Sequence, residues 1–110
     1  MMKKILLLAA MFGLAATLST KGAEAKENWT TLCAKCHGAD GKSDTKIGAK
    51  LGAKNFTDAT VQASFKDEEA FKAIKEGKKD KEDKTLMKPF DTLSDDEVKA
   101  LVAYVRSFKQ

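Results

Sequence analysis

The chain has 110 residues, which is enough for one domain and too few for two. It contains one proline, two cysteines and one histidine, which excludes a disulfide-stapled scaffold and any site that needs several imidazoles. Its 20 lysines and arginines exceed its 16 aspartates and glutamates by a formal +4. In the basic segment Lys72–Lys88 the two signs alternate, which makes a focused patch less favourable, and nucleic-acid binding has no support.

The first 25 residues have the pattern of a secretory signal peptide. Lys3 and Lys4 give a positive start, Ile5–Leu18 is apolar, and Ala23–Ala25 has the small-x-small form of a processing site. A helix over the apolar run would be roughly 21 Å long, shorter than a hydrocarbon core of ~30 Å. We therefore expect cleavage after Ala25, a periplasmic mature domain of residues 26–110, and no stable membrane insertion after cleavage.

This mature domain is short of apolar residues. It would have 85 residues with 17 basic and 15 acidic side chains, a net charge of +2. Leucine, isoleucine, valine and phenylalanine together number 16, or 19%. A chain this short, with so few apolar residues, usually needs a disulfide, a metal or a cofactor to fold.

In chain order, the first expected element is a short helix over Lys26–Lys35. A long loop should follow over Gly38–Phe56, because four of the mature glycines lie there. Nineteen residues without regular structure are unusual in a small domain unless they wrap something. Asp58–Ser64 could form one or two helical turns.

The next helix is predicted over Asp67–Glu76, with Asp67 as its N-cap and Gly77 as its C-terminal stop. Lys78–Lys88 then reads as a charged loop that ends at Pro89. No segment alternates β-branched and polar residues, so the sequence supports no strands.

The last helix has the clearest signals. Ser94 followed by Glu97 has the capping-box form, and the helix should run to about Phe108. A single apolar stripe recurs at helical spacing along it, formed by Val98, Leu101, Val102 and Val105. The fold class predicted from these patterns is all-α.

Cys33, Cys36 and His37 form the C-x-x-C-H pattern of covalent c-type haem attachment. On a helical turn these positions share one face, so two thiols could form thioethers at one edge of the macrocycle. His37 beside them could bind the iron from one side.

Three other interpretations of this pattern compete. A thioredoxin-like redox pair would need a preceding strand in a βαβ unit, and none is indicated. A zinc site would need about four ligands, and the chain has no further cysteine or histidine. A plain disulfide with His37 beside it by chance is the third.

Met87 is the candidate for the second axial ligand of the iron. The other methionines, Met1, Met2 and Met11, leave with the signal peptide. A soft thioether is a usual sixth ligand, and it favours the ferrous state. The alternative is that Met87 only fills a gap in the core. The sixth position of the iron would then hold a lysine or a water molecule, or it would be open.

With these motifs in place, the chain resembles a class I monohaem cytochrome c of the small bacterial type. The resemblance rests on the C-x-x-C-H motif, the Met87–Phe90 segment and the terminal helix around Tyr104. It implies three to four short helices wrapped around one covalently bound haem c. It also implies that the first and last helices cross, with Trp29 and Tyr104 at the crossing.

Two departures from the family pattern stand out. Members often have a glycine one turn before the first aromatic residue, where this chain has Ala25, so either the first helix is short or cleavage falls earlier. Many members also have a proline whose carbonyl accepts the ring N–H of the ligand histidine. The comparable segment, Ile47–Leu51, has none, which leaves open the carbonyl that orients His37.

The expected function is that of a monomeric, non-enzymatic one-electron carrier between larger redox proteins, whose identities the sequence does not give. The candidate haem pocket residues are Leu51, Phe56, Phe71, Ile74 and Phe90. The alternative is a haem protein with a labile methionine that acts on peroxide or senses a small gas. Lys72–Lys88 carries a local +3, read either as a docking surface or as a solvated loop of mixed charge. Without haem, the mature chain should be largely unfolded.

Overall fold

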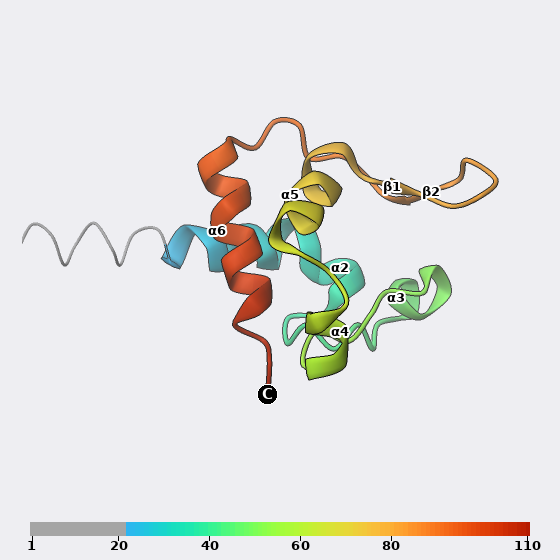
Figure 1. Ribbon diagram of the computed structural model, residues 1–110, viewed down its shortest axis with the longest axis horizontal. Coiled ribbons are helices and arrows are strands. Elements are labelled where there is room, and N and C mark those ends of the chain that lie inside the picture. The colour runs from blue at the N-terminus through green and yellow to red at the C-terminus, as the bar shows by residue number, and fades with distance from the viewer. Residues whose placement is uncertain (1–21) are drawn as a thin grey trace, which may run out of the picture.

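A computed structural model of the chain describes residues 22–110, so most of the expected signal peptide lies outside the described part. These residues fold into short helices with one small hairpin (Figure 1). Residues 22–28 are helical. The elements that follow are η2 (Trp29–Cys33), α2 (Ala34–His37), α3 (Lys46–Leu51), α4 (Ala59–Ala63), α5 (Asp67–Glu76), β1 (Lys78–Lys79), β2 (Thr85–Met87) and α6 (Asp95–Arg106).

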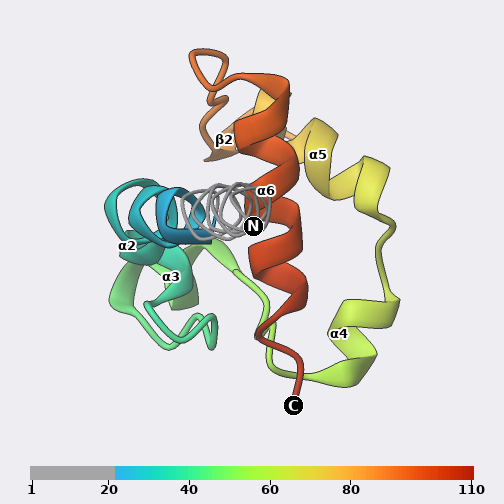
Figure 2. The same ribbon diagram turned by 90° about the vertical axis from the view of Figure 1, so that its left-hand side faces the viewer.

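The first helix and α6 cross, as the family resemblance implies (Figures 1 and 2). The ring centroids of Trp29 and Tyr104 lie 5.9 Å apart, and that of Phe108 lies 5.0 Å from Trp29. Helical structure runs from residue 22 to His37 without a break, so the first helix is longer at both ends than predicted. The prediction of an aromatic crossing is confirmed.

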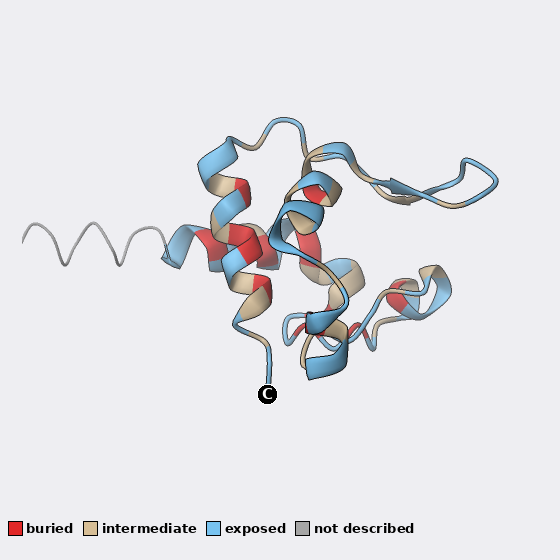
Figure 3. Ribbon diagram, in the orientation of Figure 1, coloured by how far each residue is buried: buried red, intermediate tan, exposed pale blue. Residues whose placement is uncertain are grey.

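The buried core lies mainly at this crossing (Figure 3). All four residues of the predicted apolar stripe of α6 are buried, and Val98 is fully inaccessible to solvent. Trp29 and Cys33 join them from the first helix, and Ile74 joins them from α5. The apolar stripe read from the sequence is therefore the centre of the fold.

The capping signals of α6 are confirmed. The Ser94 hydroxyl accepts a hydrogen bond from the Glu97 amide at 3.1 Å, and the Glu97 carboxylate accepts one from the Ser94 amide at 2.9 Å. The bounds predicted for α5 are also correct, but its N-cap is Lys66 and not Asp67. Asp67 instead accepts a hydrogen bond from Arg106 Nε at 2.8 Å, which ties α5 to α6.

The long loop predicted over Gly38–Phe56 is wrong in part, because it contains α3. The Thr45 side chain caps the start of α3, and Gly52 ends it with a φ of 74°. The expected turns at Asp58–Ser64 are present as α4, which Asp58 caps. Local capping by a threonine thus makes a helix in a segment whose glycines favoured a loop.

The prediction of no strands is also wrong, since β1 and β2 form a small antiparallel hairpin. Lys78 pairs with Met87 and Lys79 pairs with Thr85. Strands of two and three residues are too short to show a period of two, so the sequence pattern could not reveal them. Within residues 22–110, no helix is long and apolar enough to cross a membrane.

Candidate functional site

The C-x-x-C-H residues lie where the first helix passes from a π-helical turn to an α-helical turn. Residues Trp29–Cys33 form a π-helical turn, and the Ala34 amide bonds back to the Trp29 carbonyl. Cys36 and His37 then lie on α2, which Gly38 ends with a φ of 78°. π-Helical turns inside α-helices are frequent at functional sites.

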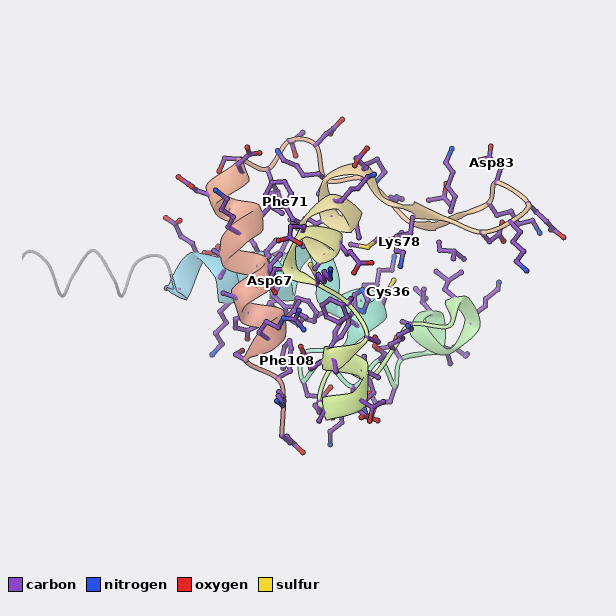
Figure 4. All side chains as sticks on the ribbon, in the orientation of Figure 1. Cys36, Asp67, Phe71, Lys78, Asp83 and Phe108 are labelled. Atoms are coloured by element: carbon purple, nitrogen blue, oxygen red, sulfur yellow. The ribbon has the colours of Figure 1, made fainter. Side chains whose placement is uncertain are left out.

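Cys33 and Cys36 form no disulfide bond. Cys33 is buried, with 8% of its surface exposed, whereas Cys36 is half-buried. Figure 4 shows Cys36 on the side of the molecule from which α3 and the β1–β2 hairpin project. Cys33 therefore lies in the core, and Cys36 lies toward the side from which α3 and the hairpin project.

Two aromatic rings lie beside His37. Its ring centroid lies 5.6 Å from that of Trp29 and 5.1 Å from that of Phe56. Trp29 Nε1 also donates a hydrogen bond to the Gly38 carbonyl at 2.9 Å, next to His37 in the chain. Trp29 thus serves both the helix crossing and the motif, a double role that the sequence did not suggest.

The environment of His37 favours its neutral form. Burial lowers the pKa of its imidazole below the ordinary value of 6.5, because the interior solvates the charged form poorly. His37 Nδ1 is buried without a hydrogen-bond partner among residues 22–110. A neutral imidazole is the form that binds a metal.

The pKa of the Cys33 thiol is shifted in the opposite direction to that of a redox-active cysteine. Burial, with a smaller contribution from Cys36, raises its pKa from 9.0 to about 11. Thiol–disulfide exchange requires a thiolate, and reactive cysteines have lowered pKa values. The motif also lies on the first helix, and no strand precedes it among residues 22–110, so it lacks the βαβ context of the thioredoxin-like interpretation.

Met87 ends β2, half-buried, and packs against the core cluster. Its pairing with Lys78 places it at the base of the hairpin and not in the loop expected from the sequence. Gly77 allows this close approach, because a Cβ there would lie 2.5 Å from the Met87 carbonyl oxygen. Phe90, just beyond, donates its amide to the Ile74 carbonyl at 2.8 Å.

The structure brings together four of the five expected pocket residues. Ile74 belongs to the core cluster, and Phe56, Phe71 and Phe90 pack against it; Phe56 also lies beside His37. Leu51 is half-buried at the end of α3. Phe71 lines an apolar crevice between α5 and α6, next to Val102, and Figure 4 shows it at that position.

Thr45 and Gly48, which sequence reasoning missed, contact the motif directly. The Thr45 hydroxyl donates a hydrogen bond to the Cys36 carbonyl at 2.6 Å, and Gly48 packs its backbone against the same carbonyl. The one sequence signal for Thr45 is its residue type, because threonine is a preferred N-cap directly before a helical segment.

The donor set fits a covalent haem and not a bare metal ion. In the described part of the chain, no group of three or more His, Cys, Asp or Glu side chains could hold a metal ion. Two cysteines three positions apart, followed by a half-buried histidine whose pKa is lowered by burial, are the groups that a c-type haem requires.

Comparisons with known proteins agree with this donor set. The sequence model of the family described as cytochrome c matches residues 22–109. The chain belongs to the cytochrome c family. It is a haem-based electron carrier, and it carries covalently bound c-type haem with iron.

Two solved structures are similar to this cytochrome. A c-type cytochrome named KustC0563 is 41% identical, with a TM-score of 0.68, over 78% of this chain and 98% of its own. A point mutant of KustC0563, with phenylalanine in place of a tyrosine, is 41% identical with a TM-score of 0.66, over 78% and 99% of the two chains. No curated protein matches the chain. The family resemblance and the all-α fold predicted from the sequence are both confirmed.

Proposed function

We propose that this cytochrome is a one-electron carrier whose iron has His37 and Met87 as axial ligands and whose haem is attached through Cys33 and Cys36. The observation that carries the proposal is the environment of His37. Burial lowers the pKa of its imidazole, its ring centroid lies 5.6 Å from that of Trp29 and 5.1 Å from that of Phe56, and Cys36 directly precedes it in the chain.

The bound haem supplies an iron that changes between the ferrous and ferric states. The residues of the chain hold that iron in place and keep water from it. Neutral His37 offers a nitrogen, and the thioether of Met87 offers a soft second donor, so no position is left for a substrate. Phe56, Ile74 and Phe90 add apolar surface, which excludes water and tunes the reduction potential.

The Met87 assignment is tested by the optical spectrum of the purified holoprotein. The ferric wild type should show the weak red charge-transfer band of sulfur-ligated haem, and Met87→Ala should lose it. Leu86→Ala is the matched control, because Leu86 is the half-buried neighbour of Met87 in β2. A red band that survives in Met87→Ala would refute the assignment.

The same samples separate electron transfer from the peroxide or gas-sensing alternative. Reduced wild-type protein should bind carbon monoxide slowly or not at all, whereas reduced Met87→Ala should bind it readily. Rapid binding by the wild type would mean that Met87 is labile, and it would favour the alternative function.

We propose larger redox proteins as the donor and acceptor, with the carrier acting as a monomer. The hairpin charges do not support a focused docking patch. Lys79 lies 3.5 Å from Asp83 and Lys84 lies 4.0 Å from Glu82, and all four side chains are exposed. Such pairs leave a solvated surface of mixed charge, so the association rate should depend only weakly on ionic strength.

We also propose export to the periplasm with cleavage after Ala25. The match to KustC0563 covers 78% of the 110 residues, about 86, which is close to the 85 of the expected mature domain. Ala25 itself is only 4% exposed within the continuous helix, so the cleavage site should be measured directly. The intact mass of the exported holoprotein decides the point. A mass that places the N-terminus anywhere other than Lys26 would contradict cleavage after Ala25.

A further inference from the structure

A single hydroxyl joins the end of α2 to the start of α3. Thr45 Oγ1 donates a hydrogen bond to the Cys36 carbonyl at 2.6 Å and accepts one from the Gly48 amide at 2.9 Å. The last carbonyls of a helix and its first amides have no partner within the helix. Thr45 therefore satisfies one group of each kind and fixes α3 against the haem-binding motif.

Gly48 brings the two backbones into direct contact. It is buried, and a Cβ at this position would lie 2.8 Å from Thr45 Oγ1, 2.9 Å from the Ser43 carbonyl oxygen and closer still to that of Cys36. No side chain fits between α3 and the Cys36 carbonyl. The contact is one of backbone on backbone, which leaves the motif little room to shift.

Ser43 binds the backbone carbonyl of His37, which follows the carbonyl that Thr45 binds. Its amide donates a hydrogen bond to the His37 carbonyl at 2.9 Å, and its hydroxyl donates one to the Lys54 carbonyl at 2.5 Å. Ser43 is 6% exposed and has a φ of 58°, a conformation that non-glycine residues seldom adopt. The carbonyls of Cys36 and His37, before and after the His37 side chain, are thus both bound by residues 43–45.

The imidazole itself has no such support, since Nδ1 lacks a hydrogen-bond partner within the described residues. Ligand histidines usually donate this N–H to a carbonyl or carboxylate, which fixes the plane of the ring. We propose that Thr45 is a positioning residue that does this through the backbone. By holding the Cys36 carbonyl, it sets the direction from which the His37 ring reaches the iron.

This inference rests on the proposed function, because it takes His37 as an axial ligand. The test compares Thr45→Val, which keeps the shape and removes the hydroxyl, with Thr45→Ser, which restores the hydroxyl. Thr30→Val is the matched control. Thr30 also donates its hydroxyl to a backbone carbonyl, that of Lys26 at 2.9 Å, but on an exposed face of the first helix.

The readout is the proton NMR spectrum of the ferric holoprotein, in which the haem methyl shifts report the orientation of the axial ligand planes. Thr45→Val should change the spread of these shifts and move the reduction potential. Thr45→Ser and Thr30→Val should keep the wild-type pattern. An unchanged pattern in Thr45→Val, or an equal change in Thr45→Ser, would overturn the proposal.

Amide exchange of Gly48 gives a second readout, and it should be faster in Thr45→Val than in Thr45→Ser. If Thr45→Val yields no holoprotein, the same spectra are taken on Thr45→Ala, whose smaller side chain adds no apolar contact. Failure of the proposed function has a different signature. The wild-type protein would then lack the spectrum of a histidine-ligated ferric haem, whatever residue stands at position 45.

Discussion

The contact between α3 and the haem-binding motif makes a sharp prediction for Gly48→Ala. The added methyl group would lie 2.8 Å from Thr45 Oγ1 and 2.9 Å from the Ser43 carbonyl oxygen, both too close for a real Cβ contact. Its three nearest neighbours are oxygen atoms, two of them on the backbone, so the clash cannot be relieved by moving the end of one flexible side chain. Relief requires α3 to move away from α2, which weakens the hydrogen bonds of Thr45.

Overpacking of this kind costs roughly 1–3 kcal/mol, and the rigid neighbours place Gly48→Ala at the upper end of that range. Gly52→Ala is the matched control at the other end of α3. Its Cβ would meet nothing within 4 Å, but its φ of 74° makes the backbone strained for alanine. That strain alone costs about 1–2 kcal/mol.

The assay is thermal unfolding of both ferric holoproteins, followed by circular dichroism. For a domain of this size, each kcal/mol lowers the Tm by roughly 4–8 °C. Gly48→Ala should therefore melt well below Gly52→Ala, and it should also disturb the haem methyl shifts, which Gly52→Ala should leave unchanged. Equal melting temperatures with identical spectra would show that α3 does not press on the motif.

Three further predictions follow from the core, the helix cap and the cofactor. Leu101→Ala, at a position 1% exposed, should lower the free energy of unfolding by roughly 2–5 kcal/mol in urea titrations. The Ser94 amide, followed by its hydroxyl, lowers the pKa of Glu97 below 4.5, so the cap stabilises the fold above that pH and is lost as the pH falls through the lower folded value. Urea titrations should accordingly show less acid destabilisation in Glu97→Gln than in the wild type, and equal acid sensitivity would exclude this effect. The double variant Cys33→Ser, Cys36→Ser, which cannot attach haem, should be largely unfolded by circular dichroism, and cooperative melting would contradict this.

The parts of the fold that the sequence predicted have strong local causes. The capping box of Ser94 and Glu97 and the apolar stripe of α6 lie within one continuous segment, so period and caps agree. The C-x-x-C-H motif is equally local, because its three residues lie within five positions. Signals of this kind need no knowledge of the tertiary structure.

The parts that the sequence missed depend on distant contacts. Thr45 is an N-cap like many others until the fold brings the Cys36 carbonyl against it. Asp67 is a good N-cap candidate, but the ion pair with Arg106, 39 positions away, uses its carboxylate instead. The hairpin that holds Met87 depends on the close approach of Gly77 and not on strand propensity.

The distribution of the core explains why a chain with so few apolar residues can fold. Among the described residues, the buried apolar side chains come from the first helix and α6, except for Ile74 of α5. The hairpin contributes none of them, and the buried residue of α3 is a glycine. These elements project from the side of the molecule that Cys36 faces (Figures 1 and 4). A haem attached at the motif would give that side the apolar surface that the sequence lacks. On this view the cofactor would form part of the apolar core as well as the redox centre.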